Sequence, residues 1–162
     1  MMQLPRVLAF CAAALAASLV AAPAVAQAEH QHMHHSSSAA VAQLQLDDGK
    51  KWPTDPTLRS GMAAIQAAFD ADHPAIHAGK ESDQQYAALA GRIEAQVQAI
   101  VANCKLPPSA DANLHFVIAD LLQGVSLMRG EDPQRTRHEG AALVHGALLA
   151  YPKYFDDPGW KG

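Results

Sequence analysis

Apolar residues recur every three or four positions through most of residues 55–152, and this spacing constrains the fold more than any other feature. Such a period places the apolar side chains on one face of an α-helix. Four stretches carry the period, and none of the intervening segments shows convincing strand alternation. The expected core-facing positions are Leu58, Met62, Ile65, Phe69 and Ile76; Tyr86, Leu89, Ile93, Val97, Ile100 and Cys104; Leu114, Ile118, Leu121, Val125 and Met128; and Arg137, Ala141, Val144, Leu148 and Tyr151. The sequence therefore predicts an all-α protein.

Capping residues, prolines and glycines indicate where these helices begin and end. The expected starts are Asp55-Pro56, Ser82 or Asp83, Ser109 or Asp111, and Asp132-Pro133. The expected stops are Gly79, Pro107-Pro108, Gly130 and Pro152. Pro74 is expected to kink or end the first helix near His73, because proline lacks an amide hydrogen.

Short connections between such helices favour antiparallel neighbours. The expected fold is an antiparallel up-down-up-down four-helix bundle that occupies residues 44–162. Residues 44–57 form an irregular leader that is expected to lay Trp52 against the domain, and the C-terminal tail carries Trp160. We expect both tryptophans to cover one end of the hydrophobic core.

Residues 1–28 have the features of a secretory signal peptide. Arg6 is the lone charge, an apolar run over 7–20 follows it, and A-x-A sites predict cleavage after Ala26 or Ala28. The run is shorter than the roughly 20 residues of a membrane span. We therefore expect export to the periplasm, with no membrane insertion after cleavage.

The charge balance and the motif content exclude several classes of protein. The chain has 12 Lys plus Arg against 16 Asp plus Glu, and 2 Trp, 3 Tyr and 4 Phe, which argues against a nucleic-acid-binding protein. No G-x-S-x-G, Walker or dinucleotide-binding motif occurs, so no enzymatic activity is predicted. With Cys11 in the signal peptide, Cys104 is expected to be buried and inert, to join two chains as a homodimer, or to act as a ligand.

Histidine is frequent, with 9 residues, and four of them follow the signal peptide closely. Residues 29–43 have a biased polar composition without an apolar period, so we expect a disordered His-rich tail. Imidazole suits copper, nickel and zinc, and a thioether adds a preference for cuprous copper. The expected metal ligands of this tail are His30, His32, Met33, His34 and His35.

The remaining histidines lie on the predicted helices, beside the apolar stripe. His115, His138 and His145 each follow a core-facing position and are expected to contribute metal ligands in the grooves between helices. His73 and His77 are four residues apart and would share a face if the first helix is unbroken. The alternative is that these histidines only flank the core, as hydrogen-bonded or solvated side chains.

Two other functions are open at this level. Met62 and His145 lie near ends of the first and fourth helices that meet in an antiparallel bundle, where they would ligate the iron of haem b in an electron carrier. Covalent haem attachment is excluded because no C-x-x-C-H motif occurs. A structural or partner-binding bundle without a ligand is the third possibility.

Three segments resemble a family of small exported proteobacterial proteins of poorly defined function. They are residues 46–52, which read Leu-Asp-Asp-Gly-Lys-Lys-Trp; residues 103–107, which read Asn-Cys-Lys-Leu-Pro, with 111–120; and residues 155–160. In size and helix layout such proteins are similar to periplasmic four-helix metal-binding proteins and, more weakly, to soluble b-type cytochromes. The resemblance implies a periplasmic location and an association with metal resistance.

Overall fold

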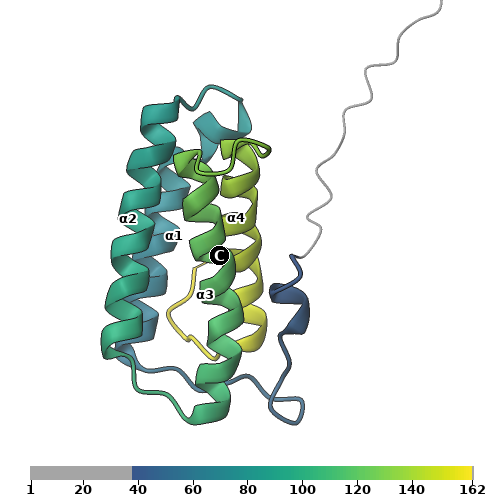
Figure 1. The fold of residues 1–162 in the computed structure, drawn as a ribbon. Helices are drawn as coiled ribbons and strands as arrows, with labels where there is room; N and C mark the ends of the chain where they lie inside the picture. The colour runs from purple at the N-terminus through teal and green to yellow at the C-terminus, as the bar shows by residue number, and fades with distance from the viewer. Residues whose placement is uncertain (1–37, 162) are drawn as a thin grey trace, which may run out of the picture. The chain divides into compact units, whose positions relative to one another are not determined.

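The computed structural model describes residues 38–161, which form four helices and a short 3-10 turn, η1. The helices are α1 (Pro56–His77), α2 (Asp83–Asn103), α3 (Pro108–Arg129) and α4 (Arg137–Tyr154), and η1 covers Val41–Gln43. Consecutive helices run in opposite directions around a common core, so the expected all-α bundle is confirmed (Figure 1). Within residues 38–161 there is no strand, and none of the helices is long and apolar enough to cross a bilayer.

The predicted apolar stripes form the core. All of the stripe positions are buried except Cys104 and Arg137, which are partly exposed. Burying a Leu or Ile side chain contributes about 1.5–3 kcal/mol, so the four stripes are the main stabilising feature of the bundle. Cys104 is a free thiol at the C-cap of α2, where it packs against the edge of the core.

Several helix ends match the expectations. The Asp55 side chain caps α1 by accepting from the Leu58 amide at 2.6 Å. Ser82 begins α2 through a capping box with Gln85, and Gly130 ends α3 in the left-handed conformation, with φ of 76°. These residues satisfy backbone groups that have no partner inside the helix.

Two expected helix ends, at Pro74 and Pro152, are wrong, and two expected helix starts are displaced. Helix α1 continues through Pro74 to His77, and α4 continues through Pro152 to Tyr154. Each proline removes only its own amide donor, and the next residues can still donate to earlier carbonyls. Helix α3 begins at Pro108 rather than at Ser109 or Asp111.

The start of α4 is also displaced from the expected Asp132-Pro133. Thr136 is the N-cap, and it forms a capping box with Glu139. Asp132 instead accepts from the Gln134 amide at 2.9 Å and stabilises the preceding turn. Asp132-Pro133 and Thr136–Glu139 could each begin a helix. The reciprocal Thr136–Glu139 box satisfies two backbone donors, more than a single Asp132 cap would.

The expected disordered tail over 29–43 is wrong in its last six residues, while 29–37 lie outside the described part of the chain. Val41 is buried in the core, and the Ser38 hydroxyl donates to the carboxylate of Asp120, which is only 2% exposed. A buried carboxylate requires hydrogen-bond donors. Asp120 therefore ties residues 38–43 to α3.

The leader and the C-terminal tail pair with each other at the end where α4 finishes. Trp52 and Phe155 form an isolated parallel bridge, with Trp52 N–H donating to the Tyr154 carbonyl at 2.7 Å. Trp160 packs on Tyr151, with ring centroids 4.9 Å apart. Both tryptophans thus lie against the bundle, and the tail continues along α1, where the Gln66 side chain donates to the Lys161 carbonyl at 2.6 Å.

Candidate functional site

Three histidines and one phenylalanine gather where α1 faces α4. The ring centroids of His73 and His145 are 5.0 Å apart, and those of His73 and His77 are 6.2 Å apart. Phe69 supports this group from the core, with its centroid 5.4 Å from His73 and 5.3 Å from His145. We refer to His73, His77 and His145 as the histidine cluster.

Helix geometry explains how the cluster forms. Phe69, His73 and His77 are spaced by four residues, so they lie on one face of α1. Because α1 is unbroken at Pro74, His77 stays on that face. His145 comes from the antiparallel helix α4 and stacks on Phe69 with an interplanar angle of 18°.

A pocket of about 410 Å³ adjoins the cluster along the same groove. His145 lines it together with Gln66 and Asp70 of α1, and Trp160 and Lys161 of the C-terminal tail form another wall. The cluster therefore borders both the apolar core, through Phe69, and an open, partly polar cavity.

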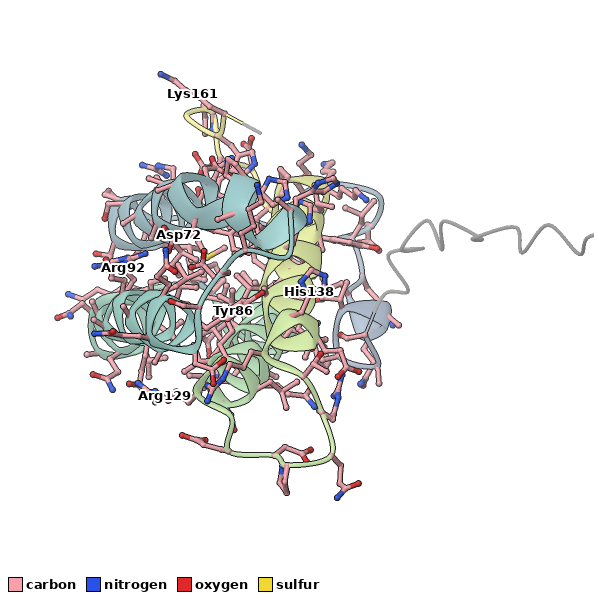
Figure 2. The ribbon with its side chains drawn as sticks, turned by 90° about the horizontal axis from the view of Figure 1, so that it is seen from above. Asp72, Tyr86, Arg92, Arg129, His138 and Lys161 are labelled. Carbon is pink, nitrogen blue, oxygen red and sulfur yellow. The ribbon has the colours of Figure 1, made fainter. Side chains whose placement is uncertain are left out.

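His138 lies apart from the cluster, at the end of the bundle where α4 begins. Its Nδ1 is 3.5 Å from the hydroxyl of the buried Tyr86 of α2 (Figure 2). Burial is the main reason that the pKa of Tyr86 is raised, so the hydroxyl stays protonated and able to donate. His138 thus has a structural partner rather than a place beside His145.

The other expected ligands are not brought together. His115 is exposed on α3, with Nδ1 2.8 Å from the Asp111 carbonyl oxygen. Met62 is fully buried in the core. His145 stacks on Phe69, which lies seven residues, or about 10 Å, along α1 from Met62. The expected haem pair of Met62 and His145 stays a prediction. The expected tail ligands His30, His32, Met33, His34 and His35 lie outside the described residues.

Side-chain orientation limits what the cluster does as it stands. Among residues 38–161, no group of three or more His, Cys, Asp or Glu side chains is positioned to hold a metal ion. The His73 and His145 rings pack against each other at an angle of 49°. Rotation about the side-chain bonds is needed before their nitrogens point to a common ion.

Glu81, in the loop between α1 and α2, was not anticipated from the sequence. Both of its carboxylate oxygens are enclosed and have no hydrogen-bond partner. Burial raises the pKa of Glu81, as does the negative charge of Asp72, while Arg92 lowers it. Asp72 and Arg92 form an ion pair between α1 and α2, and both are labelled in Figure 2. A polar residue in a surface loop gives no sequence signal for such burial.

Comparison of the chain with protein-family models, with curated proteins and with solved structures finds no match in any of the three. The resemblance to small exported proteobacterial proteins therefore remains an expectation.

Proposed function

We propose that this protein binds a transition-metal ion in the periplasm, copper foremost and otherwise nickel or zinc, for sequestration or resistance rather than catalysis. The observation that carries the proposal is the packing of two imidazoles, from His77 of α1 and His145 of α4, around that of His73. The ring centroid of His73 is only 5.0 Å from that of His145. Imidazole is the commonest protein ligand for these ions.

The ring spacing supports a shared ion. Two imidazole nitrogens bound at about 2.0–2.1 Å around a tetrahedral ion place their ring centres about 5 Å apart. The centroid separation of His73 and His145 matches this value, and the exposed His77 ring lies 6.2 Å from His73 on the same face of α1.

The His-rich tail has a separate part in the proposal. Its ligands His30, His32, Met33, His34 and His35 follow one another closely in sequence, so they suit the first capture of an ion. The histidine cluster holds its imidazoles on two packed helices, which lowers the entropy lost on binding. The cluster is thus the tighter of the two sites.

The test is Cu(II) binding by equilibrium dialysis in four forms of the full chain. These are the unaltered protein, a tail variant in which His30, His32, His34 and His35 are alanine, a cluster variant with His73→Ala and His145→Ala, and the control His115→Ala. The tail and cluster variants are each expected to lose one class of site, and His115→Ala to lose none. A cluster variant that binds as the unaltered protein does would refute the groove as a metal site.

A further inference from the structure

We propose that the pocket between α1, α4 and the C-terminal tail binds a small organic cation, an ammonium group carried on an apolar body. This binding does not depend on the proposed metal site. It follows from three features of the pocket, which are its place in the fold, the carboxylate of Asp70 and the indole of Trp160.

The pocket lies at the most loosely packed seam of the bundle. Helices α1 and α4 pack less closely against each other than any two consecutive helices do, and the C-terminal tail covers part of the gap. The tail is fixed at two points, because Gln66 donates to the Lys161 carbonyl at 2.6 Å and Trp160 packs on Tyr151 at 4.9 Å between ring centroids. The cavity that this arrangement leaves, about 410 Å³, has the size of a small-molecule site.

Asp70 gives this cavity a negative charge. It is exposed on α1 one turn after Gln66, and it lines the cavity. Within the part of the chain that the structure describes, no hydrogen bond or ion pair uses its carboxylate. Lys161 also lines the cavity, but Figure 2 shows its ammonium group pointing away from the bundle. A carboxylate in this position favours a cationic ligand, because hydrogen bonds between charged groups are stronger than those between neutral ones.

The remaining walls are largely apolar and aromatic. Leu148 and Pro152 of α4 line the cavity together with Trp160. The buried Tyr151 covers part of the Trp160 indole, which stays partly exposed. Tryptophan is the best aromatic partner of an ammonium group, and aliphatic walls remove the carbon body of a ligand from water. Together with Asp70, these walls fit an organic ammonium ion better than an inorganic cation.

The experiment compares three probes that share one phenethyl body, namely phenethylammonium, phenethyl alcohol and hydrocinnamate. Binding to the full chain is measured by isothermal titration calorimetry near pH 7, with EDTA present so that no metal ion contributes. Phenethylammonium is expected to bind at least about tenfold more tightly than the neutral alcohol, and hydrocinnamate to bind most weakly, because Asp70 attracts the first and repels the last.

Variants test the two residues that define the ligand. Asp70→Asn is expected to weaken phenethylammonium binding at least about fivefold and to leave binding of the alcohol unchanged. Asp48→Asn, at an exposed carboxylate of the leader that does not line the cavity, is the matched control expected to change neither. Trp160→Leu should also weaken phenethylammonium binding, whereas Trp160→Phe keeps an aromatic face and should retain most of it.

Equal affinities for phenethylammonium and the alcohol would overturn the cationic ligand class, as would a loss in Asp70→Asn no greater than that in Asp48→Asn. Failure of all three probes to bind at millimolar concentration would overturn the pocket as a small-molecule site. Neither result bears on the histidine cluster as a metal site, since EDTA is present throughout. Circular dichroism checks that each variant folds, and Asp70→Ser replaces Asp70→Asn if the asparagine variant does not.

Discussion

His145 of α4 stacks on Phe69 of α1, with ring centroids 5.3 Å apart and planes at 18°. This contact joins the core of the bundle to the histidine cluster, because Phe69 is buried and also packs against His73 at 5.4 Å. The positions of the two imidazoles therefore depend on an apolar side chain that cannot itself bind an ion.

Replacing this support is expected to affect stability and metal binding together. Phe69→Leu keeps an apolar core residue and removes the aromatic platform, with an expected loss of about 1 kcal/mol in the free energy of unfolding. Cu(II) affinity should fall as well, since His73 and His145 lose their common contact. Urea denaturation and a Cu(II) titration measure the two effects, and Val101→Ala, at a 61% exposed position of α2, is the control expected to change neither. Unchanged Cu(II) affinity in Phe69→Leu would show that metal binding by the histidine cluster does not depend on the contact with Phe69.

The close approach of α3 and α4 at Gly124 gives a second prediction. A Cβ atom at Gly124 would lie 2.7 Å from the Gly140 carbonyl oxygen, so Gly124→Ala must push the helices apart, at a cost of about 1–3 kcal/mol. Gly146 on α4 is the matched control, because a Cβ there meets nothing within 4 Å. Gly146→Ala is expected to stabilise by roughly 0.5–1 kcal/mol through helix propensity. Thermal unfolding of both variants tests these opposite effects. A midpoint for Gly146→Ala below that of the unaltered protein would contradict the prediction.

The enclosed carboxylate of Glu81 predicts a pH dependence. Its pKa is raised in the folded protein above the ordinary value of 4.5, so the fold favours the protonated form. The stability from this group is complete below pH 4.5 and is lost as the pH rises through the raised pKa. Glu81→Gln removes the charge, and we expect it to be more stable than the unaltered protein at pH 7 by about 1 kcal/mol.

The measurement is urea denaturation of both proteins at pH values between 4 and 7, spaced by about one pH unit. The advantage of Glu81→Gln should shrink toward the acidic end. Glu131→Gln, at an exposed position, is the control. An advantage that is constant with pH would show that the Glu81 charge is not its cause.

The start of α4 provides a fourth prediction. Thr136 accepts from the Glu139 amide at 3.1 Å as the N-cap, so Thr136→Ala is expected to cost about 1 kcal/mol. Asp132→Ala removes only a contact in an exposed turn, and its effect should stay within about 0.5 kcal/mol. Thermal unfolding measures the loss of stability in both variants. A larger loss for Asp132→Ala than for Thr136→Ala would indicate that Asp132 caps α4, as the sequence predicted.

The helix faces were predictable because burial imposes a strict period on each segment. Leu58, Phe69 and Leu121 lie in the core as their spacing requires. The prolines were poor guides to helix ends, since Pro74 and Pro152 each remove one donor near an end where few bonds remain to be lost.

The candidate site was only partly predictable. The spacing of His73 and His77 indicates a shared face, but a sequence does not fix the register between α1 and α4. That register pairs His145 with Phe69 rather than with Met62, which lies about two turns away. The enclosure of Glu81 depends on how a loop folds over two helices, which no local pattern encodes.

The most direct test of the account is a Zn(II) titration followed through the imidazole signals in NMR spectra of the full chain carrying the tail substitutions. We expect the ring resonances of His73, His77 and His145 to shift together and to saturate at one ion per chain, while that of His115 stays in place. Resonances of the three that do not move, or that move no more than that of His115, would contradict metal binding by the histidine cluster.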